Sequence, residues 1–163
     1  TGKNLIVCVS NITQNKLEYI SVDTYPEMKV STAIKMSTAI PILYVPVKYY
    51  NDLYADSFIH NNLPVDYFDF VQNNTLGVDV ITDISNNDTS SFSNYLKSLY
   101  TNIMTNICEK TNGKHNHICE VIIPSSFKNF DFLKMKFDLD EDKFDTLVDL
   151  GYKSMQRFIQ ESK

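Results

Sequence analysis

The sequence predicts an α/β fold in which a mixed sheet is flanked by helices. Short apolar runs, bounded by polar residues or proline, recur along the chain and are typical of strands. Two longer stretches in the second half carry apolar residues at helical spacing. Strands that alternate with helices favour a sheet covered by helices.

The first strands are predicted at residues 5–9 and 17–22. Residues 5–9 form a continuous apolar run, which indicates a strand buried on both faces. The polar residues 10–16 between the two runs are expected to form a turn. A short loop rich in asparagine favours pairing of the two strands as a hairpin.

A short helix and a short strand are predicted next. The helix spans residues 29–38 and has to end before Pro41, because a residue that precedes proline disfavours helical geometry. Asn51 and Asp52 are expected in a turn before a strand at residues 53–55. Asp56 then stands where this strand ends and backbone groups are exposed.

The second half of the chain is predicted to hold two strands and two long helices. The strands lie at residues 76–82, expected inside the sheet, and at residues 118–123, ended by Pro124. The first helix carries an apolar stripe that is expected to be buried. The stripe comprises Phe92, Tyr95, Leu96, Leu99, Ile103 and Ile107. The last helix begins near residues 140–142 and is indicated by Phe144, Leu147, Val148, Met155, Phe158 and Ile159.

Composition and charge narrow the classes of function. The 163 residues suit one domain, or a portion of a longer one, and 43% of them are hydrophobic. A net charge of -5 without clustered Lys or Arg argues against nucleic-acid binding. The three cysteines lack a disulfide-framework spacing, which favours a reduced, intracellular protein. No apolar run has the length of a membrane-spanning helix.

The segment around Asp56 carries a family resemblance. It continues from Asp56 through Ser57 and Phe58 to Asn61-Asn62-Leu63-Pro64. This segment resembles the one with the catalytic aspartate in patatin-like acyl hydrolases, Asp-Gly-Gly or Asp-Gly-Ala followed by Asn-Asn-x-Pro. The segments 23–26, 36–41, 137–140 and 150–152 also resemble that family. The likeness maps residues 1–163 to a single domain or to the C-terminal half of a longer patatin-like domain.

The resemblance implies a lipid acyl hydrolase, a phospholipase A-type serine esterase with a Ser-Asp dyad. Asp56 is the implied catalytic residue, and no metal or organic cofactor is implied. The family's nucleophile lies in Gly-x-Ser-x-Gly, which this chain lacks. The expected partners are therefore an N-terminal half with that serine and a lipid or membrane-surface substrate, so that the chain alone is expected to be inactive. A location peripheral to membranes is also implied.

Several alternatives stay open. Ser57 and Phe58, which replace glycines, also fit a catalytically inactive lipid- or protein-binding module. His60 could complete a Ser-His-Asp triad. Cys108, His115, His117 and Cys119 could bind zinc, although their spacing matches no common module. Asp138, Asp140 and Asp142 are similar to the start of a calcium loop but lack its later glycine and glutamate, so that helix capping by Asp140 explains them better.

Overall fold

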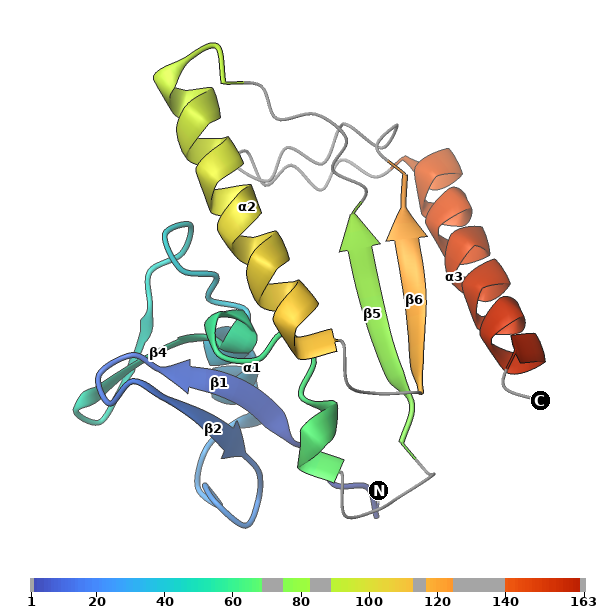
Figure 1. Ribbon diagram of the computed structural model, residues 1–163. Helices are drawn as coiled ribbons and strands as arrows, with labels where there is room; N and C mark the ends of the chain where they lie inside the picture. The colour runs from blue at the N-terminus through green and yellow to red at the C-terminus, as the bar shows by residue number, and fades with distance from the viewer. Residues whose placement is uncertain (1, 69–74, 83–88, 113–116, 125–139, 162–163) are drawn as a thin grey trace. The chain divides into compact units, whose positions relative to one another are not determined.

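The structure is a computed structural model that describes residues 2–68, 75–82, 89–112, 117–124 and 140–161. It divides into two compact units. The first unit comprises Thr1–Pro64 and Tyr100–Gly113, and the second comprises Val65–Leu99 and Lys114–Lys163. Strands and helices occur in both units, as the α/β prediction requires (Figure 1).

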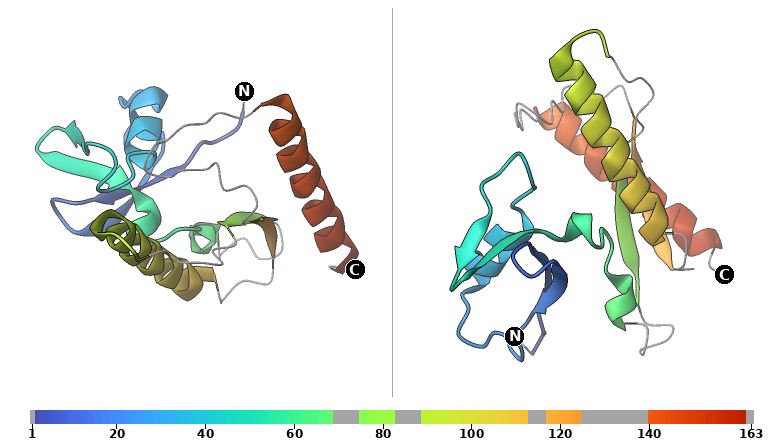
Figure 2. Two further views of the ribbon diagram at one scale, coloured as in Figure 1. Left: turned by 90° about the horizontal axis from the view of Figure 1, so that it is seen from above. Right: turned by 60° about the vertical axis from the view of Figure 1, so that its left-hand side comes forward.

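The first unit is built on a four-stranded antiparallel sheet. Its strands are β1 (Val7–Asn11), β2 (Lys16–Ile20), β3 (Val47–Tyr49) and β4 (Asp52–Asp56), in the order β2-β1-β4-β3. Helix α1 (Val30–Ser37) packs against β1 and β4, as Figure 1 and the turned views of Figure 2 show. The predicted hairpin is confirmed as the pair β1 and β2.

The first strand lies two residues later than predicted and includes residues that were expected in the turn. Ser10 and Asn11 are both fully buried. Their side chains have hydrogen-bond partners inside the protein, so these polar residues can continue a buried strand. The turn is shorter, and Asn15 within it adopts a left-handed φ of 50°, which asparagine tolerates.

Strand β3 has no counterpart in the sequence prediction. It is only three residues long and pairs with β4, from Val47 opposite Tyr54 to Tyr49 opposite Asp52. The connecting turn is made by Tyr50, with a left-handed φ of 51°, and Asn51. Asp52 is thus the first residue of β4 and not part of the turn.

The core of the first unit lies between α1 and the sheet. Met36 and Ala33 project from α1 onto Val9 of β1 and Tyr54 of β4, and all four side chains are buried. Small residues after α1 continue this close packing, because Ala39 is buried and Thr38 bonds back to the Ile34 carbonyl oxygen at 2.9 Å.

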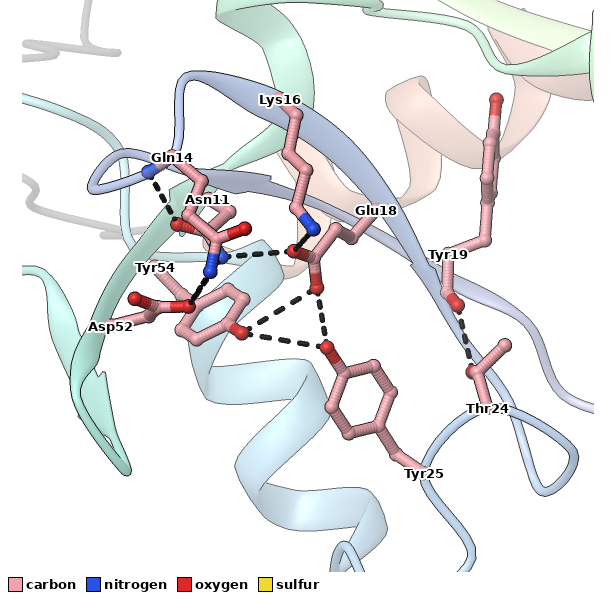
Figure 3. Close-up of polar contacts among 9 residues, drawn as sticks. All are labelled: Asn11, Gln14, Lys16, Glu18, Tyr19, Thr24, Tyr25, Asp52 and Tyr54. Atoms are coloured by element: carbon pink, nitrogen blue, oxygen red, sulfur yellow. Dashed lines mark hydrogen bonds and ion pairs between the residues drawn. The ribbon is translucent and has the colours of Figure 1, made fainter.

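A polar network holds three strands of this sheet together (Figure 3). The Asn11 amide nitrogen donates to Glu18 on β2 and to Asp52 on β4, at 2.9 Å in each case. Glu18 also accepts a hydrogen bond from Tyr25 and pairs with Lys16. Burial raises the pKa of Glu18, but these hydrogen bonds and the Lys16 charge outweigh it and lower that pKa. The carboxylate is therefore held in its charged form.

The second unit contains a parallel pair of strands. Strands β5 (Gly77–Thr82) and β6 (Ile118–Ile123) are paired, and helix α3 (Glu141–Glu161) packs beside β6 (Figure 1). Asp140 caps α3, because its carboxylate accepts a hydrogen bond from the Lys143 N–H at 2.9 Å. The capping role predicted for Asp140 is confirmed.

Helix α2 (Phe92–Asn112) is confirmed, but its apolar stripe is not buried as expected. Five of the six stripe residues are exposed, and their exposed fractions range from 43% for Leu99 to 76% for Phe92. The sixth, Ile107, is half-buried. The pattern of the sequence records which face of the helix is apolar, whereas burial depends on what packs there. None of the helices in the described residues combines the length and the apolar character that a membrane span requires.

The packing of Met36 predicts a large loss of stability on truncation. Met36→Ala removes a fully buried side chain, which costs about 2–5 kcal/mol of unfolding free energy. Urea denaturation measures this value. Ile34→Ala on the same helix is the control, because Ile34 is 49% exposed and its loss is expected to change stability by less than about 0.5 kcal/mol. Equal effects of the two substitutions would contradict the assigned core.

Candidate functional site

Asp56 lies at the end of the central strand β4, as predicted. Its backbone pairs with Val9 of β1, and its N–H donates to the Ala39 carbonyl oxygen at 3.0 Å. The backbone of Asp56 is therefore held by β1 on one side and by the segment after α1 on the other.

The residues after Asp56 form a single 3-10 turn, η1 (Ser57–Ile59). Asp56 caps this turn, since its Oδ1 accepts a hydrogen bond from the Phe58 N–H at 3.0 Å. Neither Ser57 nor Phe58 is among the described residues with a positive φ. The turn thus has no position that requires glycine, and both side chains are accommodated without backbone strain.

The asparagines of the predicted motif shape the loop that follows. The N–H groups of His60 and Asn61 both donate to the Ser57 carbonyl oxygen at 2.8 Å. The Asn61 side chain is buried, and its Oδ1 accepts a hydrogen bond from the Leu63 N–H at 3.1 Å. This local turn directs the chain to Pro64, which gives Asn61 a structural role beside Asp56.

The surroundings of Asp56 disfavour its charge. Burial raises the pKa of Asp56, and the hydrogen bond from the Phe58 N–H opposes this shift. Burial also raises the pKa of the Cys8 thiol and of Tyr100, and the Asp56 charge acts on both in the same direction. Asp56 thus forms a partly buried acidic centre next to a buried thiol and a phenol.

His60 is bonded to Ser10 and not to the aspartate. The distance from Ser10 Oγ to His60 Nδ1 is 2.8 Å. Among the described residues, no hydrogen bond joins His60 to Asp56. The arrangement therefore differs from a Ser-His-Asp chain, and it fastens the loop after Asp56 to strand β1. Sequence reasoning missed Ser10. Its signal was available, because Cys8 and Ser10 are two residues apart in β1 and therefore share the face of the strand that this loop covers.

The metal alternatives gain no support from the part of the chain that can be described. His115 and Asp138 lie outside the described residues, as does the side chain of Cys108. His117 is exposed, whereas Cys119 is 1% exposed on β6. No group of three or more potential metal ligands occurs within the described ranges.

Comparison with known proteins connects the N-terminal part of the chain to one family. Residues 2–69 match the family model described as patatin-like phospholipase. The chain is also 42% identical over 66 residues to a protein named probable lipid hydrolase 463L, from Invertebrate iridescent virus 6. That match covers 40% of this chain and 23% of the viral protein. The resemblance noted around Asp56 is confirmed.

Two further matches extend along nearly the whole chain. Protein R571 of Acanthamoeba polyphaga mimivirus is 28% identical, over 96% of this chain and 54% of its own length. The chain thus spans about half of this relative. The crystal structure of VipD from Legionella pneumophila matches 98% of this chain and 31% of that one, with a TM-score of 0.64 and 20% identity. This likeness confirms the α/β fold.

The raised pKa of Asp56 predicts that its charge reduces stability. A raised pKa means that the native protein binds this proton more tightly than the unfolded chain does. The stability that Asp56 contributes is thus present at low pH and is lost as the pH rises through the raised pKa. Asp56→Asn is expected to raise the urea midpoint at pH 7, with the gain disappearing below about pH 4.

Asp23→Asn provides the control for this measurement. Asp23 is an exposed carboxylate in a loop of the same unit, so that its neutralisation is expected to leave the urea midpoint nearly unchanged. A midpoint for Asp56→Asn that is below that of the wild type at pH 7 would contradict the electrostatic description of the site.

Proposed function

The segment 2–69 is patatin-like, and we propose that the protein is a lipid acyl hydrolase in which Asp56 is the acidic member of a Ser-Asp dyad. The similarity of this segment to a protein named as a probable lipid hydrolase supports the proposal. The reaction is hydrolysis of a lipid ester bond, of the phospholipase A type, by way of an acyl-serine intermediate.

The observation that carries the proposal is the position of the Asp56 carboxylate. One oxygen is fixed by the Phe58 N–H, and no donor among the described residues bonds the other oxygen. A carboxylate held in this way can accept the proton of a serine hydroxyl as that serine attacks a carbonyl carbon. Burial raises the pKa of Asp56, which makes it a stronger base once it is ionised.

The serine and the oxyanion donors have to come from outside this chain. A nucleophile elbow needs glycines on both sides of the serine, and oxyanion donors lie in backbone loops that are commonly rich in glycine. The four glycines of the chain are dispersed and form no such motif. They are Gly2, Gly77, Gly113 and Gly151. We propose that the N-terminal half of a longer protein supplies the nucleophile and that residues 1–163 alone are inactive.

Strand β5 supports the presence of a further covering segment. Its valines at 78 and 80 are exposed, at 47% and 59%, whereas Asp79 between them is buried. Leu76, two residues before Val78, lies on the same face and is 50% exposed. An apolar face on a parallel strand is normally covered, because parallel sheets are buried on both sides. The match covers 54% of the mimivirus relative, and we propose that the corresponding further part of the complete protein covers this face.

The proposed dyad predicts a large loss of activity when Asp56 is replaced. Asp56→Ala and Asp56→Asn in the complete protein are each expected to reduce the turnover of a phospholipid substrate by roughly two to four orders of magnitude. Release of fatty acid from phospholipid vesicles measures this turnover.

Asp23→Asn is again the matched control and is expected to retain activity, because this carboxylate lies in an exposed loop. Labelling by a fluorophosphonate probe identifies the nucleophilic serine directly. Unchanged turnover in both Asp56 variants would show that the dyad assignment is wrong. A complete protein that takes no label would instead favour the binding-module alternative.

The proposed N-terminal half predicts that the outer face of β5 becomes protected. Val80→Cys is expected to react with a maleimide in the isolated chain and to react at least about tenfold more slowly in the complete protein, because burial blocks access to the thiol. Val22→Cys is the control, since Val22 is 63% exposed in a loop of the first unit. Equal reactivity of Val80→Cys in the two forms would contradict the assignment.

A further inference from the structure

The loop at residues 40–46, which follows α1, exposes aliphatic side chains to an unusual degree. Ile42 is 88% exposed and Val45 is 85% exposed, the two highest values among the large apolar residues of the described chain. Tyr44 between them is 45% exposed. Scattered apolar residues on a surface are ordinary, but two nearly bare aliphatic side chains in one short loop indicate an interaction surface.

The loop is ordered, although its tip is exposed. The N–H groups of Leu43 and Tyr44 both donate to the Ile40 carbonyl oxygen, at 3.3 Å and 2.9 Å. Pro41 and Pro46 restrict the backbone at its two ends. A loop that is already ordered loses little entropy when its side chains enter an apolar phase.

The backbone at Ile42 is strained, which points to a role for its side chain. Its φ is 74°, in the left-handed region that glycine and asparagine occupy far more readily than a β-branched residue. A loop that needed only to reverse direction would be more stable with asparagine at this position. An observed strain of this kind is a reason to look for function at the residue that carries it.

The charged residues in the sequence on either side of the loop have a single sign. Between Glu27 and Asp52 the chain has no acidic residue, although the whole chain carries a net charge of -5. The charged residues of this stretch are Lys29, Lys35 and Lys48, and all three are exposed. Exposed aliphatic residues flanked by lysines match an anionic lipid surface, where apolar groups enter and cations meet headgroups.

The loop is also joined to the candidate site. Ala39, which immediately precedes it, accepts the hydrogen bond from the Asp56 N–H at 3.0 Å. We infer that residues 40–46 dock the protein on an anionic lipid–water interface, with Ile42 and Val45 inserted. The inference deepens the proposed function and rests on it, because a hydrolase of aggregated lipids has to bring its site to their surface.

Flotation of the complete protein with vesicles tests this docking. Ile42→Asn combined with Val45→Asn is expected to bind at least about tenfold more weakly to vesicles of phosphatidylcholine and phosphatidylserine in equal parts. The double variant is expected to fold, because both side chains are exposed and asparagine is compatible with a left-handed φ. Circular dichroism verifies folding, and Val22→Asn is the matched control, expected to bind as the wild type does.

The basic residues give a second, independent measurement. Lys35→Ala combined with Lys48→Ala is expected to weaken binding to the anionic vesicles by about fivefold per lysine and to leave binding to pure phosphatidylcholine unchanged. Added salt is expected to reduce this difference, because screening weakens the attraction of exposed charges.

Three results would overturn the inference. The first is a wild-type protein that does not float with anionic vesicles, and the second is a double Asn variant that floats as well as the wild type. The third is a double Asn variant that changes only the oligomeric state in gel filtration, which would identify the loop as a protein interface. Flotation requires no turnover. A protein that floats through this loop and yet hydrolyses no lipid would therefore refute the proposed hydrolase while supporting the docking loop.

Discussion

The buried side chain of Asn11 is the constraint on which the first unit depends. Its amide nitrogen bonds the carboxylates of Glu18 and Asp52, on the strands at either side, and its Oδ1 accepts the N–H of Gln14 at 3.0 Å. A slip of one residue in either pairing would break these bonds and move Val9 out of the core. Because Asp56 ends the strand that Asp52 begins, the same contacts determine where the candidate acidic residue lies.

The two units differ in how completely they bury their apolar residues. In the first unit, Met36 and Val9 are fully buried between helix and sheet. In the second unit, Val80 of β5 and Phe144 of α3 remain more than half exposed. Polar residues at the core of the first unit, such as Ser10, have hydrogen-bond partners within that unit. The first unit thus has a well-packed core beside the candidate site, and its most exposed apolar side chains, Ile42 and Val45, lie in the loop at residues 40–46.

The sequence predicted those features that depend on local pattern. Each long helix and most strands followed from apolar periodicity, and the position of Asp56 followed from the strand before it. Contacts between distant residues were beyond such reasoning. The bond from Ser10 to His60 spans 50 positions, and it explains why a polar residue continues β1. Strand β3 was missed because its three residues carry no pattern of their own and pair only through β4.

The 3-10 turn after Asp56 has a consequence for how relatives of this chain are recognised. Serine and phenylalanine occupy the positions where glycines are usual, and the turn is nevertheless formed with ordinary backbone angles, capped by the aspartate itself. A signature that demands glycine would discard such chains as degenerate copies. A criterion based on the shape of the turn, with a capping carboxylate at a strand end, would retain them as candidates and would widen the range of sequences in which this site is sought.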